Sequence, residues 1–227
     1  MTTTSNTRSI FDIIGPVMVG PSSSHTAGAV RLGALARAIF GEQPSIARIE
    51  LYGSFLDTGE GHGTHVALIA GLLGLGVDDP RIPDSFELAT SMGLNFSFEE
   101  LDLDDAHPNT ARFILECPER DKLFTITGSS LGGGNVIVTR IGSFDVEATG
   151  DLPVIVVRHT DAPGVISAVT AMFAADEINI ASMKMSRERR GAEALMMFEC
   201  DCLADRSIIE KLKTIPQVHK VRVVPAV

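Results

Sequence analysis

The stretch from Pro153 to Val227 carries the pattern that most constrains the fold of this chain. Apolar residues between Val165 and Phe173 recur at helical spacing, and Asp205 can cap a second helix that ends near Lys213. β-Branched and apolar runs predict strands at 154–158, 178–186, 194–202 and 218–224. The order strand, helix, strand, strand, helix, strand predicts a ferredoxin-like βαββαβ unit.

A seam that contains glycine and proline precedes this unit. Gly150 and Pro153 stand between two apolar runs, so we expect a linker at 149–153 with a domain on either side. The expected division is a flexible N-terminus at 1–8 and domains at 9–148 and 154–227.

The first domain is expected to contain both helices and strands. Helices are expected at 26–40 and 64–75. Strands are expected at 46–52, 112–116, 123–127 and 135–141. The whole chain is therefore predicted to be an α/β (α+β) protein.

Composition excludes several classes of protein. Lys and Arg number 19 and Asp and Glu 29, and a net charge of −10 repels the phosphates of nucleic acids. The longest nearly apolar run, residues 66–77, is much shorter than the roughly 20 residues that a membrane-spanning helix needs. Cys117, Cys200 and Cys202 cannot form a full disulfide set, and the N-terminus lacks an apolar signal segment. We therefore expect a cytoplasmic protein whose cysteines are structural.

A run of serines stands at the start of the first expected helix. Ser22, Ser23, Ser24 and Thr26 offer hydroxyl and backbone N–H donors at the positive end of the helix dipole, where a carboxylate or phosphate can bind. His25 lies among them and can act as an acid or a base. The alternative is a plain helix cap, since serine and threonine are common there.

Three further motifs belong to the first domain. Glycines flank His62, which favours a histidine presented on a loop, although a structural histidine is the alternative. His107 and Asn109 flank a proline that fixes a turn, which can equally be a turn that starts a strand. A glycine-rich segment at 127–135, with Gly132 and Gly133, is expected to form a loop between two strands that allows a ligand to approach the backbone, and the alternative is a plain glycine-rich hairpin without a ligand. It is not a phosphate-binding P-loop, because no Gly-Lys-Ser/Thr follows.

The last motif follows the first strand of the ferredoxin-like unit. His159, Asp161 and Gly164 come directly after that strand, and Asn179 starts the second strand. We expect these two places to lie close together and to bind the charged ends of an amino acid. The alternative is a structural module without a ligand.

Four segments of the chain resemble the β domain of iron–sulfur-dependent L-serine dehydratases (L-serine ammonia-lyases): SIFDIIGPVMVGPSSSHTAGAVRLG, GHGTH, HPNT and GSSLGGG. The segment after the seam, VIVVRHTDAPGVISAVTAMFAADEINIASM, is similar to an ACT domain, a ligand-sensing module of amino-acid enzymes. The two resemblances cover nearly the whole chain after residue 8. They imply a serine dehydratase β domain, related to the allosteric substrate-binding domain of some phosphoglycerate dehydrogenases, followed by an ACT domain.

The resemblance also implies a partner. In two-chain members of the family, an α chain carries a [4Fe–4S] cluster whose open iron acts as a Lewis acid on L-serine. A base removes the Cα proton, hydroxide leaves, and aminoacrylate breaks down to pyruvate and ammonia. The chain described here is then the β chain, which holds no metal ion of its own.

Roles for individual residues follow from the same resemblance. It implies catalytic roles for His25, His62, His107 and Asn109, without identifying the base. It implies substrate contacts for Ser22, Ser23, Ser24, Thr26, Gly132 and Gly133. It implies effector contacts for His159, Asp161, Gly164 and Asn179. Many relatives have an acidic residue where His65 stands, so no role is assigned to His65. ACT domains usually pair, so a homodimer is expected.

Two other functions remain open on the sequence. The ACT-like segment alone would suit a stand-alone regulatory protein that binds L-serine or another amino acid. A metal hydrolase would instead use His25, His62, His65 and His107 as ligands.

Overall fold

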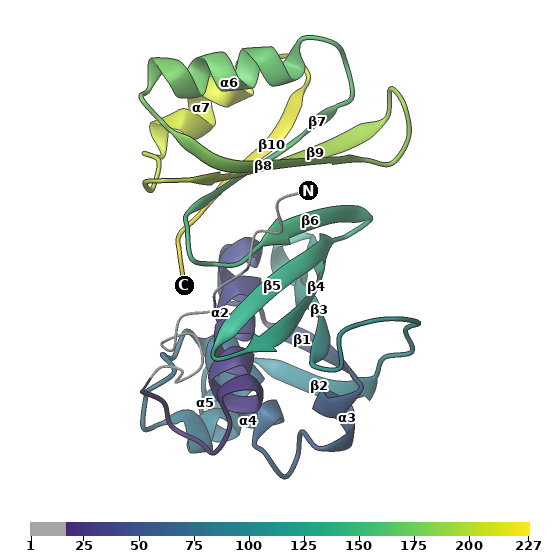
Figure 1. The fold of residues 1–227 in the computed structure, drawn as a ribbon, viewed down its shortest axis with the longest axis vertical. Coiled ribbons are helices and arrows are strands. Elements are labelled where there is room, and N and C mark those ends of the chain that lie inside the picture. The colour runs from purple at the N-terminus through teal and green to yellow at the C-terminus, as the bar shows by residue number, and fades with distance from the viewer. Residues whose placement is uncertain (1–16) are drawn as a thin grey trace, which may run out of the picture.

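The computed structural model describes residues 17–227 and shows two sheets, each with helices on one face (Figure 1). The flexible N-terminus expected at 1–8 lies outside the described residues. The helices are η1 (Ser23–Ala27), α2 (Gly28–Phe40), α3 (Ser54–Asp57), α4 (Thr64–Leu73), η2 (Ile82–Asp84), α5 (Ser85–Ser91), η3 (Pro118–Arg120), α6 (Val165–Ala175) and α7 (Ser207–Lys213). Within residues 17–227, no helix is long and apolar enough to cross a membrane.

The first sheet has six strands in the order β2-β1-β3-β4-β5-β6. Its strands are β1 (Ile46–Tyr52), β2 (Asn95–Glu100), β3 (Thr110–Cys117), β4 (Lys122–Gly132), β5 (Asn135–Ile141) and β6 (Phe144–Ala148). Only β1 and β2 run parallel, and the other neighbours are antiparallel. The strands expected at 46–52 and 135–141 are confirmed, the one expected at 112–116 lies within the longer β3, and the one expected at 123–127 is the first half of β4.

The expected glycine-rich loop at 127–135 is mostly strand, which corrects the sequence-based interpretation. β4 continues to Gly132 because Gly128 and Ser129 pair with both β3 and β5 in the middle of the sheet. The chain turns only at Gly133 and Gly134, both of which have positive φ. Glycine at 128 leaves room for the neighbouring strand, since a Cβ there would lie 2.7 Å from the carbonyl oxygen of Ile137.

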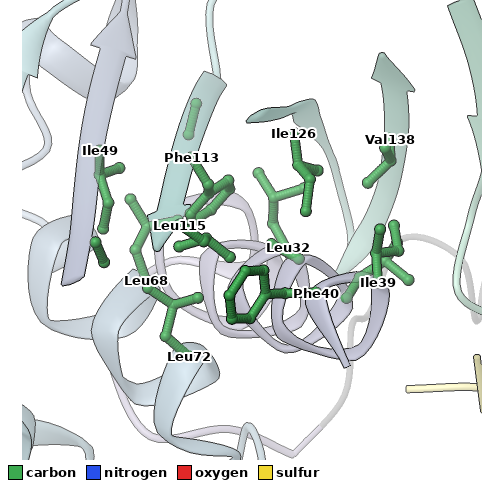
Figure 2. Close-up of a cluster of buried hydrophobic side chains, with 14 of the residues drawn as sticks. Leu32, Ile39, Phe40, Ile49, Leu68, Leu72, Phe113, Leu115, Ile126 and Val138 are labelled. Carbon is green, nitrogen blue, oxygen red and sulfur yellow. The ribbon is translucent and has the colours of Figure 1, made fainter. Parts of the chain in front are cut away.

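Two helices, α2 and α4, cover one face of this sheet and bury its core (Figures 1 and 2). Figure 2 shows side chains of both helices directed at strands β1, β3, β4 and β5: Leu32, Ile39, Phe40, Leu68 and Leu72 from the helices, and Ile49, Phe113, Leu115, Ile126 and Val138 from the strands. The helices cross closely at Gly71, where a Cβ would lie 2.0 Å from the carbonyl oxygen of Val30. The helix expected at 64–75 is present as α4, which ends at Leu73 because Gly74 caps it with a positive φ, and Gly71 allows the close packing.

The second sheet has the order β10-β7-β9-β8, with all neighbours antiparallel. Its strands are β7 (Val154–Thr160), β8 (Ile180–Arg187), β9 (Glu193–Cys200) and β10 (Val218–Val224). Helices α6 and α7 cover one face and bury a separate core that includes Val157, Phe173 and Phe198. The predicted ferredoxin-like βαββαβ order is confirmed.

The open face of the second sheet rests on the first unit (Figure 1). Val154, Leu195, Met197 and Val224 belong to the same buried cluster as the core under the first sheet. Arg222 on β10 also donates hydrogen bonds to the carbonyl oxygens of Ile39 and Phe40 at the end of α2. The two sheets are therefore joined by apolar contacts and by a charged side chain that caps a helix.

Candidate active site

The register of three neighbouring strands brings the polar motifs of the first domain to one end of the sheet. Tyr52 at the end of β1 lies beside Thr110 at the start of β3, and Thr110 lies beside Ser129 on β4. The segments just outside these positions carry the histidines, and η1 packs against β4 and α4 at the same end. Motifs far apart in sequence therefore meet in space.

His25 stands in a shell of hydroxyl groups. Its Nδ1 lies 3.2 Å from Ser24 Oγ, and its Nε2 lies 3.1 Å from Ser54 Oγ and 3.2 Å from Thr58 Oγ1. The side chain of Phe55 meets the imidazole edge-on at 5.4 Å between ring centroids. Both ring nitrogens are thus occupied by hydroxyls, which hold the ring in one orientation.

Burial keeps His25 neutral. The residue is 9% exposed, and this desolvation lowers the pKa of its imidazole below 6.5, against the opposing effect of the Ser54 carbonyl. The nearby His62 lowers it further. At neutral pH the ring is therefore uncharged and can both donate and accept a proton.

His62 contacts His25, with 4.9 Å between the ring centroids, and is exposed. Its Nδ1 lies 2.8 Å from the carbonyl oxygen of Thr58. A carbonyl oxygen can only accept, so Nδ1 carries the proton and a neutral His62 keeps its lone pair on Nε2. Thr26 fixes the backbone of the same loop, because its hydroxyl donates to the carbonyl oxygen of His62 at 3.4 Å.

The serine run forms the entrance to α2 through a five-residue π-helical turn, η1. Ser22 Oγ accepts the backbone N–H of His25 at 3.2 Å and lies 3.4 Å from Ser24 Oγ. Single π turns are frequent at functional sites because they re-aim side chains without ending the helix. Ser22, Ser23 and Ser24 are half-buried, so a ligand at the start of the helix can reach them.

The His107–Thr110 segment packs against the same end. The Pro108 carbonyl oxygen accepts the N–H of Phe55 at 3.2 Å, and His107 Nδ1 accepts the N–H of Asn109 at 3.1 Å. A neutral His107 therefore carries its proton on Nε2. Asn109 is tied to β4, since its carbonyl oxygen accepts the N–H of Ser130 at 2.9 Å. These bonds anchor the segment, and no contact joins His107 directly to the described ring atoms of His25 or His62.

Gly132 and Gly133 lie at the β4–β5 turn beyond Ser130. The turn is held to α2, because Arg31 donates to the carbonyl oxygen of Gly134 at 3.0 Å. Ser130 Oγ itself is fully buried against Gly28 and has no hydrogen-bond partner within residues 17–227. Thr64 Oγ1, at the first residue of α4, is buried and unpaired in the same described region.

Sequence reasoning missed Ser54, Thr58 and Ser130 as parts of this cluster. Ser130 lies inside the glycine-rich motif, but a serine within a strand has no distinctive spacing. Ser54 follows Gly53 directly after β1, so the sequence indicates only a turn at the end of a strand and not a site residue.

The expected effector residues of the second unit do not lie together within one chain. β7 and β8 are both antiparallel to β9 and so run parallel to each other, with α6 crossing back between them. The end of β7 and the start of β8 therefore lie at opposite ends of the sheet, which corrects the expectation that they are close. Asp161 binds Arg187 at 2.9 Å and the N–H of Gly191 at 3.0 Å, whereas Asn179 donates to Asp201 at 2.6 Å.

The other two expected effector residues have structural partners. His159 is 1% exposed on the helix-covered face of the sheet, and its Nδ1 lies 2.8 Å from the carbonyl oxygen of Thr160. Gly164 caps α6 with a φ of 88°. The backbone N–H of Gly191 and the guanidinium of Arg187 both bind the carboxylate of Asp161, and these contacts lower its pKa.

No group of three or more His, Cys, Asp or Glu side chains within residues 17–227 could hold a metal ion. His65 packs edge-on against Phe98 at 4.5 Å, away from any shared ligand set. His25, His62, His65 and His107 therefore do not form one ligand group within the described residues. The cysteines do not fit an iron–sulfur cluster either: Cys117 and Cys200 are buried on separate sheets, and Cys202 is exposed.

Comparisons with known proteins agree with this architecture. Residues 9–90 match the family model "Serine dehydratase beta chain", and residues 153–217 match that of the ACT domain. The "Probable L-serine dehydratase, beta chain" of Bacillus subtilis is 42% identical over 94% of this chain and 96% of its own length. The "L-serine dehydratase, beta chain" of Peptoniphilus asaccharolyticus is 37% identical over 91% of each chain. A D-3-phosphoglycerate dehydrogenase of Methanocaldococcus jannaschii is 31% identical over 45% of this chain and 20% of its own. The chain therefore belongs to the family of L-serine dehydratase β chains and carries an ACT domain at residues 153–217.

Proposed function

We propose that this chain is the β subunit of an iron–sulfur-dependent L-serine ammonia-lyase, which converts L-serine to pyruvate and ammonia together with an α chain. The observation that carries the proposal is the contact between His25 and His62 within a cluster of hydroxyl groups. That cluster occurs in a chain similar to L-serine dehydratase β chains over nearly its full length.

His62 is the proposed base. It is exposed, and the Thr58 carbonyl oxygen fixes its proton on Nδ1, so Nε2 is free to accept the Cα proton of L-serine. Loss of hydroxide from Cβ then gives 2-aminoacrylate, and water converts that product to pyruvate and ammonia. His25, buried and held by three hydroxyls, is the proposed positioning residue that keeps His62 oriented.

Substrate recognition is assigned to the neighbouring donors. Ser22, the N-cap of η1, and Ser23, Ser24 and Thr26 within η1 are the groups proposed to bind the carboxylate of L-serine, because hydroxyl donors and the helix dipole favour an anion there. His107 and Asn109, and the turn at Gly132 and Gly133, complete the proposed wall of the site.

The [4Fe–4S] cluster is assigned to the α chain, because the cysteines of this chain do not gather into a ligand set. The steps assigned to this chain are binding and proton transfer only. We also propose a cytoplasmic location and the division of the chain at 149–153 into a β domain and an ACT domain.

Regulation is assigned to paired ACT domains. Asp161 follows Thr160, which pairs with Glu193 of β9, and Asn179 precedes Ile180, which pairs with Cys200 of β9. Glu193 and Cys200 stand at the two ends of β9, roughly 20 Å apart at about 3.3 Å per residue. An amino acid that contacts both residues must therefore bridge two chains. Homodimerisation through the ACT domain, with His159 and Gly164 supporting the loop, is proposed for this reason.

The test is an anaerobic assay of pyruvate formed from L-serine by the chain with and without the α chain that co-purifies with it. We expect activity only in the complex. His62→Gln in the complex should lower kcat by about 10²–10⁴-fold, as expected for loss of a general base. The matched control is His219→Gln, an exposed histidine of the ACT domain that contacts Thr160.

Wild-type turnover by His62→Gln would remove the assigned base. If no second chain co-purifies and no activity appears, a stand-alone amino-acid-binding function is better supported than a lyase subunit. That alternative predicts that L-serine or another amino acid raises the melting temperature of the isolated chain by mass action.

A further inference from the structure

A cavity of about 240 Å³ lies between the two units, away from the histidine cluster. Its floor is formed by the end of α2 and the β5–β6 turn, and its roof by the open face of the ACT sheet. Apolar side chains make up part of the wall: Ile39, Leu123, Phe124, Phe144, Val156 and Leu195. At about 30 Å³ for each water, the space is large enough for an organic molecule of several heavy atoms.

Cations dominate the polar part of this wall. Arg158, Lys220 and Arg222 line it, against the single carboxylate of Glu188. Arg158 is paired with Glu193, and Glu188 accepts a hydrogen bond from Ser143 at 2.8 Å. Lys220 and Arg222 have no carboxylate within 4.0 Å in the part of the chain that the structure describes.

Lys220 and Arg222 both lie over the aromatic ring of Phe124. Lys220 Nζ lies 5.0 Å from the ring centroid and Arg222 Cζ 5.1 Å from it. Two like charges beside one ring repel each other, and burial together with Arg222, Lys122 and Arg158 lowers the pKa of Lys220. An anion in the cavity would relieve this repulsion, and the surrounding apolar surface would suit a short carbon chain.

We propose that this cavity binds a small organic carboxylate with a short apolar body, whose carboxylate meets Lys220 and Arg222 and whose carbon chain lies against Phe124 and Leu195. The class that fits is a compact carboxylic acid with a short carbon chain, for which 2-oxobutyrate is a convenient probe. Both units line the cavity, so the ligand would strengthen their contact. The site is separate from the histidine cluster, because Ile39 lies near the end of α2, whereas Ser24 lies in η1 before its start.

The experiment is isothermal titration calorimetry of the full chain with 2-oxobutyrate, alongside inorganic phosphate and 2-butanone. We expect binding of 2-oxobutyrate and weaker binding of the other two. Lys220→Glu should weaken 2-oxobutyrate at least about tenfold, the loss of one charge pair in a partly buried site. Lys213→Glu, on the exposed end of α7, is the matched control and should bind like the wild type.

A second variant guards against misfolding. Leu123→Glu adds a carboxylate at the cavity wall from a side chain that is 62% exposed, so it should repel the ligand without disturbing the core. His62→Gln should leave 2-oxobutyrate binding unchanged, which separates this site from the proposed active site. Unchanged affinity in both cavity variants, no binding up to about 10 mM, or equal affinity for phosphate would overturn the proposal.

Discussion

Burial makes His25 a sensor of pH for the stability of the protein. Its folded pKa lies below 6.5, so the unfolded chain binds a proton more readily than the folded chain as the pH falls. The free energy of unfolding should therefore be highest above about pH 6.5, the ordinary pKa of histidine, and should decrease as the pH falls below it. Urea unfolding at a series of pH values measures this slope.

The variant His25→Gln should flatten that pH dependence, because glutamine keeps hydrogen-bonding groups beside Ser54 and Thr58 but cannot titrate. Some slope should remain, since burial also lowers the pKa of His65. An identical slope in the variant and the wild type would show that His25 does not contribute.

The cysteines should differ sharply in reactivity. Cys202 is exposed, whereas Cys117 and Cys200 are buried, and burial raises the pKa of Cys200 to about 11. The thiolate is the reactive form, so a disulfide reagent at pH 8 should label one thiol per native chain and three in denaturant. Loss of the fast label in Cys202→Ser identifies the site, and rapid labelling of two thiols in the native chain would contradict it.

Among the elements, the α2–α4 crossing reverses the usual effect of a glycine substitution. In an exposed helix, Gly→Ala stabilises by up to about 1 kcal/mol. At Gly71 the new Cβ would lie 2.0 Å from the Val30 carbonyl oxygen, so the helices must move apart. Gly71→Ala should therefore destabilise the protein by about 1–3 kcal/mol in urea unfolding.

The control for this helix crossing is Gly61→Ala, in a loop where the nearest atom to a new Cβ is 3.9 Å away. It should change the free energy of unfolding by less than about 0.5 kcal/mol. A stabilised Gly71→Ala variant would mean that propensity outweighs the close contact.

Periodicity predicted the elements whose side chains alternate between core and solvent or recur every helical turn. β2 was not predicted because it is an edge strand with little alternation between core and solvent. Only Phe96 and Phe98 are half-buried, and its other residues are exposed. β6 has the alternating pattern of a strand, since Phe144, Val146 and Ala148 alternate with acidic residues. It was not predicted because it is short and lies next to the linker. The four polar motifs of the site were visible in the sequence; their convergence depends on the strand register, which local patterns do not encode.

At the scale of the whole molecule, the shared core should make the two units unfold together. Val154, Leu195, Met197 and Val224 pack with the first unit, so differential scanning calorimetry should give a single cooperative transition. Two resolved transitions in the wild type would contradict this coupling.

Arg222 should contribute strongly to that coupling. Arg222→Ala removes charged hydrogen bonds to the carbonyl oxygens of Ile39 and Phe40, each worth about 1.5–3 kcal/mol. We expect a lower melting temperature and a broadened or split transition. Arg206→Ala, an exposed arginine before α7, is the control and should melt like the wild type.

The continuous helical segment formed by η1 and α2 is anchored at both ends, by the hydroxyl cluster around His25 in η1 and by Arg222 at the end of α2. Each residue of a helix adds about 1.5 Å and a rotation of about 100°. Deleting one residue between these anchors would turn His25 away from His62 or pull the end of the helix from Arg222. We therefore expect relatives that keep both anchors to have the same number of residues between them, with differences in length confined to other segments.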